Sequence, residues 1–145
     1  MLRYKLFLLL SFFVFIVGID LNGQECLTFV YASDCHYGLT REFRGYEASS
    51  EEVNAAMIEV IRHLSETDMP LDGGVLQGKR IQGLDFIVNG GDIANRMEDG
   101  VQTATESWRQ FSKAWLSEPL AYDDEGNVTP IYIIAGNHDI SNAIG

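Results

Sequence analysis

The stretch IYIIAGNHDI, residues 131–140, joins a run of apolar residues directly to three polar side chains that can bind metal ions. The β-branched residues of its first half favour a buried β-strand. Gly136 follows the apolar run, and Asn137, His138 and Asp139 come next. Because a buried strand is a rigid support, this junction predicts polar side chains held in place at the edge of a sheet.

The same kind of junction occurs twice earlier in the chain. The apolar run LTFVYAS, residues 27–33, is followed by Asp34 and His36, and the run LDFIVN, residues 84–89, is followed by two glycines and Asp92. These runs are almost wholly apolar, a pattern typical of strands in a parallel sheet that helices cover on both faces. The sequence therefore predicts three buried strands that each end in a polar cluster.

Two amphipathic segments separate the strands. Residues 49–64 begin with a capping box of Ser49 and Glu52 and predict a helix. Residues 103–117 predict a second helix, whose aromatic stripe favours packing in the core. The apolar positions at helical spacing are Val53, Met57, Val60, Ile61 and Leu64 in the first helix and Ala104, Trp108, Phe111 and Trp115 in the second.

The order strand, helix, strand, helix, strand indicates an α/β fold, a layered sheet flanked by helices. Right-handed crossovers make the three strands parallel. Ligands of such sheets bind outside the carboxyl ends of the strands, so we expect the three polar clusters to converge on one edge. Residues 37–48 predict a polar loop after the first cluster. Its Tyr37, Arg41 and Arg44 are candidates to contact a phosphate, with a surface role as the alternative.

The charge balance argues against one class of partner. The chain has 145 residues, enough for one domain, with 10 Lys and Arg against 21 Asp and Glu and a net charge of −11. Such a chain is poorly suited to the phosphate backbone of a nucleic acid, so we expect no stable nucleic-acid binding. An acidic surface by itself also has a simpler explanation, because it keeps proteins in solution.

Residues 1–23 are typical of a secretory signal peptide. Arg3 and Lys5 precede an apolar run, residues 6–17, and a short polar stretch follows it. The run is shorter than the ~20 residues that a membrane span needs. We therefore expect cleavage, a mature domain of residues 24–145 without a membrane span, and a secreted or periplasmic protein. The alternative is an uncleaved segment that anchors the chain to the membrane.

The two cysteines, Cys26 and Cys35, are not expected to pair with each other. The predicted strand between them, at ~3.3 Å per residue, separates them beyond the ~7 Å between Cα atoms that a disulfide allows. Cys35 is therefore interpreted as a small buried side chain beside the polar cluster, with metal ligation as the alternative.

The residue types at the three strand ends suit a divalent metal ion. Carboxylate, imidazole and amide oxygen are ligands for ions such as Mn²⁺, Fe²⁺ or Zn²⁺. Asp34 and His36 are two positions apart, so both project to the same side of an extended segment. Asp92 can bridge two cations. The glycines before Asp92 and Asn137 allow sharp turns and a close approach of the backbone.

Taken together, the three clusters resemble the first three motifs of the calcineurin-like metallophosphoesterase family. The resemblance covers nearly all of the predicted mature chain. It implies the N-terminal part of a β-sandwich flanked by helices, with a centre that holds two metal ions. The matching residues are Asp34-x-His36, Gly91-Asp92-x-x-Asn95 and Gly136-Asn137-His138-Asp139.

The resemblance also implies a role for each matching residue. The two divalent ions would be Mn, Fe or Zn, and Asp34 and His36 would bind the first of them. Asp92 would bridge both ions, and Asn137 would bind the second. Asn95 would have a supporting role.

The reaction that the resemblance implies is hydrolysis of a phosphate mono- or diester of a small molecule. A hydroxide activated by two metal ions would attack phosphorus without a covalent intermediate. His138 would contact the substrate and protonate the leaving oxygen, and Asp139 would orient His138. No tyrosine follows Asp92 at the matching position, so the chain resembles the ordinary branch of the family rather than the purple acid phosphatases.

The sequence departs from the family in one respect. The family usually supplies further histidine ligands, including a late Gly-His-x-His motif, whereas this chain has 3 histidines, His36, His63 and His138. We interpret the chain as the N-terminal part of a longer enzyme and expect weak metal binding and little activity if it ends at residue 145. One alternative is an inactive, truncated domain that binds a partner. Another is a nucleotide-binding module, which the absence of a glycine-rich phosphate loop disfavours.

Overall fold

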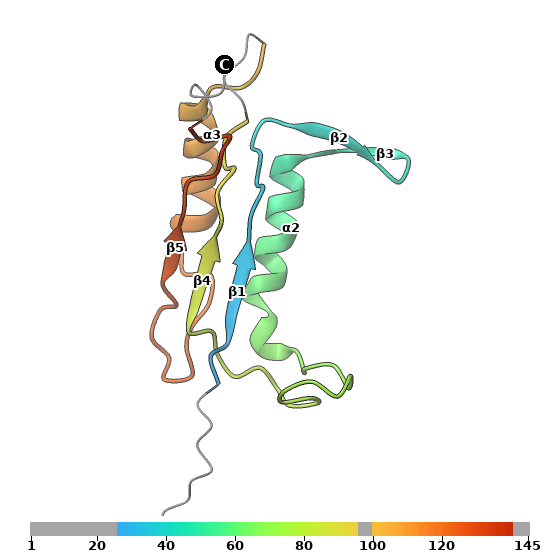
Figure 1. Ribbon diagram of the computed structural model, residues 1–145, viewed down its shortest axis with the longest axis vertical. Helices are drawn as coiled ribbons and strands as arrows, with labels where there is room; N and C mark the ends of the chain where they lie inside the picture. The colour runs from blue at the N-terminus through green and yellow to red at the C-terminus, as the bar shows by residue number, and fades with distance from the viewer. Residues whose placement is uncertain (1–25, 96–99, 141–145) are drawn as a thin grey trace, which may run out of the picture.

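A parallel three-stranded sheet forms the centre of the computed structural model, which describes residues 26–95 and 100–140 (Figure 1). The strands are β1 (Phe29–Ala32), β4 (Phe86–Asn89) and β5 (Ile131–Ile133), in the order β1-β4-β5. Both pairs of neighbours are parallel. The three predicted strands and their parallel arrangement are confirmed, and each strand is shorter than the apolar run that contains it.

The first predicted helix is α2 (Ser50–Arg62), and a 3-10 turn, η1 (Leu64–Glu66), follows it. The capping box is confirmed: the Ser49 hydroxyl accepts from the amide of Glu52 at 3.2 Å, and the Glu52 carboxylate accepts from the amide of Ser49 at 2.8 Å. These bonds satisfy two amide groups that the start of a helix would otherwise leave unpaired.

The side of α2 that faces the core matches the prediction only in part, with Ile61 buried and Met57 and Leu64 packed against the core. Val53 and Val60 are more than half exposed, whereas Asn54, Ile58 and Ile61 are buried. The reason is a polar contact, because the Asn54 amide donates to the carbonyl of Cys35 beneath the helix, and also to that of Ser50 in its own first turn. A pattern based on apolar residues alone places a buried asparagine on the wrong side.

The second predicted helix is α3 (Ala104–Phe111), which continues into a π-helical turn, η2 (Ser112–Leu116). Phe111 and Trp115 are fully buried, and their rings stack with centroids 5.6 Å apart. Trp108 is 48% exposed although its ring stacks on Phe111. The aromatic stripe therefore packs in the core over its last two members only.

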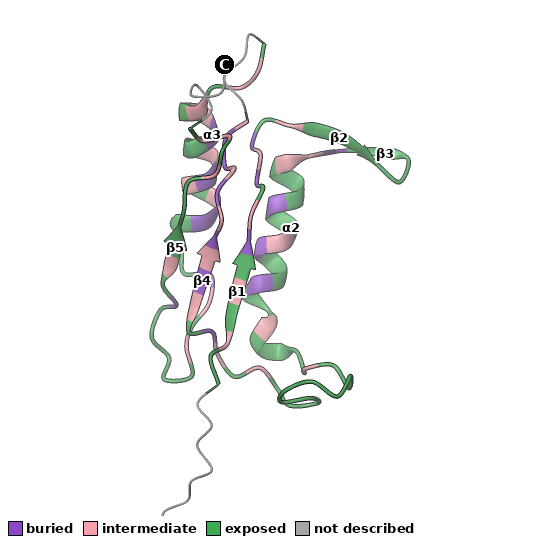
Figure 2. Cartoon of the chain, viewed as in Figure 1, coloured by how far each residue is buried: buried purple, intermediate pink, exposed green. Residues whose placement is uncertain are grey.

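Both helices pack on the same face of the sheet, so the expectation of cover on both faces is wrong for the described residues. Ile61 of α2 and Trp115 of η2 belong to one core cluster with Ile87 of β4. Figure 2 shows buried residues along the side of α2 that faces the sheet, and exposed residues on much of β1 and β5. On the open face Phe29 and Tyr132 are about half exposed, and both contact the ring of Phe86. Aromatic pairs across neighbouring strands therefore account for apolar residues on a face that no helix covers.

Residues that the sequence predicts as a loop form a β-hairpin of β2 (Thr40–Phe43) and β3 (Tyr46–Ser49). Arg44 and Gly45 connect the strands, both with positive φ, as two-residue hairpin turns require. The hairpin projects away from the sheet (Figure 1), and nearly all of its residues are exposed. Its polar strands have no apolar alternation, and this explains why the pattern did not reveal them.

Within the described residues no helix combines the length and the apolar character that a membrane span requires. The predicted signal peptide, residues 1–23, lies outside the described part of the chain.

We expect Ser49→Ala to lower the free energy of unfolding by about 1 kcal/mol, because the start of α2 loses its cap. Urea denaturation would measure this change. Ser65→Ala is the matched control, since Ser65 is exposed and its hydroxyl makes no hydrogen bond within the described residues. An equal effect of the two substitutions would contradict the prediction.

The cap also gives this prediction a pH dependence. The backbone amide of Ser49, and then its hydroxyl, hold the pKa of Glu52 below its ordinary value of 4.5. A carboxylate with a lowered pKa stabilises the fold above its ordinary pKa and loses that contribution as the pH falls through the lowered value. The difference between the wild type and Ser49→Ala should therefore shrink in acid below about pH 4.5.

Candidate metal centre

The loops that follow β1 and β4 run side by side at the carboxyl edge of the sheet. The amide of Asp34 donates to the carbonyl of Gly91 at 3.0 Å, and the amide of His36 donates to the carbonyl of Asp92 at 2.8 Å. The loop after β5 joins them, because the amide of His138 donates to Asp92 Oδ1 at 2.8 Å. The expected convergence of the three polar clusters on one edge is confirmed.

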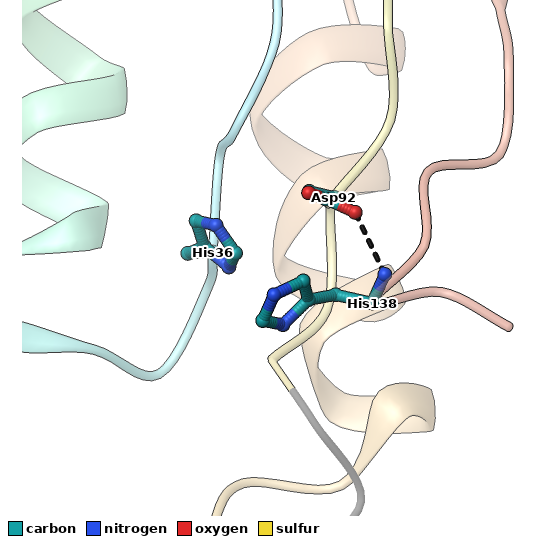
Figure 3. Close-up of side chains that lie close together, drawn as sticks. All are labelled: His36, Asp92 and His138. Atoms are coloured by element: carbon teal, nitrogen blue, oxygen red, sulfur yellow. Dashed lines mark hydrogen bonds between the residues drawn. The ribbon is translucent and has the colours of Figure 1, made fainter. Parts of the chain in front are cut away.

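Three of the predicted site residues come together at this edge. One possible ligand atom each of His36, Asp92 and His138 lies within 4.8 Å of the other two. The two imidazole rings are nearly perpendicular, with centroids 4.6 Å apart and planes at 82° (Figure 3). All three residues are partly buried, and each comes from a different loop.

Two further predicted ligands are more exposed than the three residues of this cluster. Asp34 is exposed; its Oδ1 is 3.6 Å from Nε2 of His36, and its other oxygen accepts from the hydroxyl of Ser33. Asn137 is also exposed, next to His138 in the loop after β5. The structure therefore places Asp34 beside the cluster and leaves Asn137 at the surface.

Asp139 contacts the backbone of two loops. One of its carboxylate oxygens accepts from the amide of Gly136 and the other from the amide of Ala94, each at 2.9 Å. The Nδ1 atom of His138 is buried and has no hydrogen-bond partner, so Asp139 is not bonded to that nitrogen. The carboxylate ties the loop after β5 to the loop after β4.

Two glycines let these loops approach each other, as the sequence predicts. A Cβ atom on Gly91 would overlap the backbone of Ile134 and Gly136, and Gly91 has φ +91°. A Cβ atom on Gly136 would overlap the backbone nitrogen and the carboxyl group of Asp92. Any larger residue at either position would push the two loops apart.

Three of the predicted metal ligands have a left-handed backbone. Asp34 has φ 60°, His36 has φ 41° and Asp92 has φ 51°. This conformation costs roughly 1–2 kcal/mol per residue that is not glycine. Strain of this kind persists where the surrounding structure holds it, and it clusters at functional sites.

The donor set and its surroundings fit a divalent cation. Within residues 26–95 and 100–140 no lysine or arginine forms an ion pair with Asp34, Asp92 or Asp139. The Nδ1 atoms of His36 and His138 are buried and lack hydrogen-bond partners. Because buried polar atoms are normally paired, and imidazole with carboxylate is a common ligand set for divalent metals, a bound ion would account for both features.

Cys35, between two of the predicted ligands, is a buried thiol. Burial raises its pKa above 9.0, and the sulfur accepts a hydrogen bond from Nδ2 of Asn89 at 3.3 Å. The burial of the sulfur and its hydrogen bond to Asn89 favour the interpretation as a small buried side chain over metal ligation. Cys26 is exposed, and both cysteines are free.

The sequence did not identify two buried asparagines that contact this centre, Asn54 and Asn89. Each is a polar residue in an otherwise apolar pattern, which was the available signal. Of the candidates for a phosphate contact, Tyr37 is fully buried against Phe111 and belongs to the core. Arg44 lies at the hairpin turn, over the ring of Phe43 at 5.2 Å.

Comparison with known proteins identifies a family that covers most of the chain. The model of the calcineurin-like phosphoesterase family matches residues 27–144, which is most of the chain. Neither the curated proteins nor the solved structures contain a significant match to the chain. The matched residues include all three loops of the cluster, and the chain therefore belongs to the calcineurin-like phosphoesterase family.

Proposed function

We propose that this protein is a hydrolase that cleaves a phosphate mono- or diester with the help of two divalent metal ions, Mn, Fe or Zn. The observation that carries the proposal is the meeting of His36, Asp92 and His138 at the carboxyl edge of the sheet. Family membership supports it, because the cluster lies in the region that matches the calcineurin-like phosphoesterases.

Each metal-binding role falls to a residue at this edge. Asp34 and His36 would hold one ion and Asn137 the other, with Asp92 between them. Cations bound there would stabilise the attacking and leaving oxygens of an in-line displacement at phosphorus. The carboxylates of Asp34 and Asp92, which pair with no lysine or arginine of residues 26–95 and 100–140, supply the negative charge that such binding needs.

His138 is the proposed proton donor to the leaving oxygen. Its imidazole lies beside that of His36, and its backbone amide is fixed by Asp92. Asp139 would orient His138 indirectly, because its two bonds to backbone amides fix the loop that carries the histidine. A positioned acid of this kind contributes ~10²–10⁴-fold to a reaction rate.

The substrate in this proposal is a small molecule with a phosphate ester, in an extracytoplasmic compartment. The extracytoplasmic compartment is inferred from residues 1–23, whose charged start and short apolar run are typical of a secretory signal peptide.

We expect the full-length protein to hydrolyse p-nitrophenyl phosphate or its bis-ester, to lose this activity with a chelator and to regain it with Mn²⁺. His138→Ala should lower kcat by ~10²–10⁴-fold, because the leaving oxygen loses its proton donor. A colorimetric assay at saturating substrate measures both effects.

His63→Ala is the matched control for this experiment. His63 is half exposed at the end of α2, where its ring contacts Glu59, and its replacement should have no effect on the rate. Hydrolysis that survives chelation, or an equal loss in both histidine variants, would contradict the proposed function.

A further inference from the structure

The side chain of Asn89 connects two of the loops that form the metal centre. Asn89 is the last residue of β4 and is fully buried. Its Nδ2 donates to the sulfur of Cys35 at 3.3 Å, and its Oδ1 accepts from the amide of Gly91 at 3.0 Å. One amide group therefore bonds to the loop after β1 and to the loop after β4.

Cys35 is held from a second direction by α2. The Nδ2 atom of Asn54 donates to the carbonyl of Cys35 at 3.0 Å, and Asn54 is itself buried. The sulfur and the carbonyl of Cys35 are thus both fixed by asparagine side chains. Asp34 and His36 flank Cys35, so fixing Cys35 also restrains the backbone of these two neighbours. Both neighbours have positive φ.

Packing alone does not explain an asparagine at this position. The neighbouring core is apolar, and burial of an amide group is unfavourable unless its donors and acceptors are bonded. A leucine, which also branches at Cγ, would suit the apolar surroundings better. What the amide adds is a pair of hydrogen bonds directed at the two loops, one of them to Gly91, where the backbone turns with φ +91°.

We propose that Asn89 is a positioning residue, which sets the relative placement of the first two metal-bearing loops through Cys35 and Gly91. This inference deepens the proposed function and rests on it, because the placement of the two loops matters for metal binding only if they carry metal ligands. Residues that orient metal ligands typically change metal affinity by ~10–100-fold when they are replaced, and this range sets the expected effect.

The first test uses the histidine side chains of the metal-free protein. NMR spectra of the imidazole nitrogens in the full-length protein, assigned with single His→Gln variants, distinguish His36 and His138 from the remote His63. We expect Asn89→Leu to shift or broaden the resonances of His36 and His138 and to leave those of His63 unchanged. Unchanged spectra for all three would overturn the proposal, whether or not the protein binds metal.

Thr129→Val is the matched control. Thr129 is buried, and its hydroxyl donates to the carbonyl of Leu84 at 2.9 Å, before the start of β4 and therefore at the other end of that strand. The substitution also removes one buried hydrogen bond from the core while keeping the side-chain volume. If Asn89 were merely structural, both variants would perturb the imidazole spectra to the same small extent.

A pair of Cys35 variants tests the same link without a change at Asn89. Cys35→Ser keeps an acceptor for the Asn89 amide, whereas Cys35→Val, a somewhat larger apolar residue, removes it. Only the valine variant should reproduce the shifts of the His36 resonances. Equal spectra for the two variants would contradict a role for the bond to sulfur, even if Asn89→Leu itself fails to fold.

The second readout is the affinity for Mn²⁺, measured by isothermal titration calorimetry. Asn89→Leu should raise the Kd by at least ~10-fold relative to the wild type, and Thr129→Val should leave it unchanged. If the full-length wild type binds no Mn²⁺, the proposed function fails, and the imidazole spectra alone then decide on Asn89. If Mn²⁺ binds equally to all variants, the proposed function stands and the role of Asn89 is rejected.

Discussion

Replacement of Asp92 by asparagine is expected to abolish divalent metal binding and to lower phosphoesterase activity by about 10³-fold, with little effect on the fold. The two side chains have the same shape, and the oxygen of the new amide group could still accept from the backbone amide of His138, as the carboxylate does at 2.8 Å. What is lost is the negative charge next to the two imidazoles. Removal of one such electrostatic group costs ~10²–10³-fold in other enzymes, and loss of the cation adds to that cost.

The matched control for Asp92→Asn is Asp85→Asn. The carboxylate of Asp85 also accepts from a backbone amide, that of Thr28 at 2.6 Å, but it precedes β4 and so lies at the opposite end of that strand. Calorimetric titration with Mn²⁺ and thermal unfolding of both variants separate a lost charge from a lost fold. Retained Mn²⁺ affinity in Asp92→Asn would refute the assignment of Asp92 as a ligand.

The second large effect is expected from Gly91→Ala, which should lower the free energy of unfolding by about 2–5 kcal/mol and remove metal binding. Part of the cost, ~1–2 kcal/mol, is the left-handed conformation with φ +91°. The rest, ~1–3 kcal/mol, comes from overlap of the new Cβ with the backbone of Ile134 and Gly136. Backbone atoms of a sheet edge cannot move as a flexible side chain can, so the loops must separate.

Gly126→Ala isolates the second part of this cost. Gly126 has φ +86°, nearly the same as Gly91, yet nothing lies within 4 Å of the Cβ that the substitution would add. Only the conformational cost of ~1–2 kcal/mol applies there. Urea denaturation of both variants measures the difference, and equal destabilisation would show that the close approach of the loops has no energetic role.

The strands and the position of the centre could be predicted because their signals are local. Each apolar run ends at a glycine or an aspartate, and the parallel arrangement follows from the order of strands and helices. The capping box of Ser49 and Glu52 is likewise contained within four residues. Physical rules that act over short stretches of chain are readable from one sequence.

The open face of the sheet could not be predicted because it depends on aromatic pairing across strands. Phe29 and Phe86 are far apart in the sequence, and their rings stack at 4.9 Å without a covering helix. An unbroken apolar run is the same in the sequence whether a helix or a second aromatic ring covers it. The hairpin of residues 40–49 escaped prediction for the opposite reason, since its exposed strands carry no apolar pattern.

The partners of Asn54, Asn89 and Asp139 could not be predicted either. Each side chain bonds to atoms that the fold brings near: a carbonyl, a sulfur or a backbone amide on another loop. The residue type indicates that the side chain needs a hydrogen-bond partner if it is buried, but the identity of that partner depends on the tertiary structure. The resemblance assigns Asp139 to the orientation of His138, and the structure adds that its bonds are to backbone amides.

The order of the strands has a consequence for the kinetics of folding. Phe29 pairs with Phe86 and Ile87 pairs with Ile131, so the sheet closes long loops before any ligand cluster exists. Chains that depend on such non-local pairs fold slowly. Because the three loops lie beyond the ends of the strands, their contacts should form after the rate-limiting step. A metal ion would then lower the unfolding rate constant and leave the folding rate constant nearly unchanged.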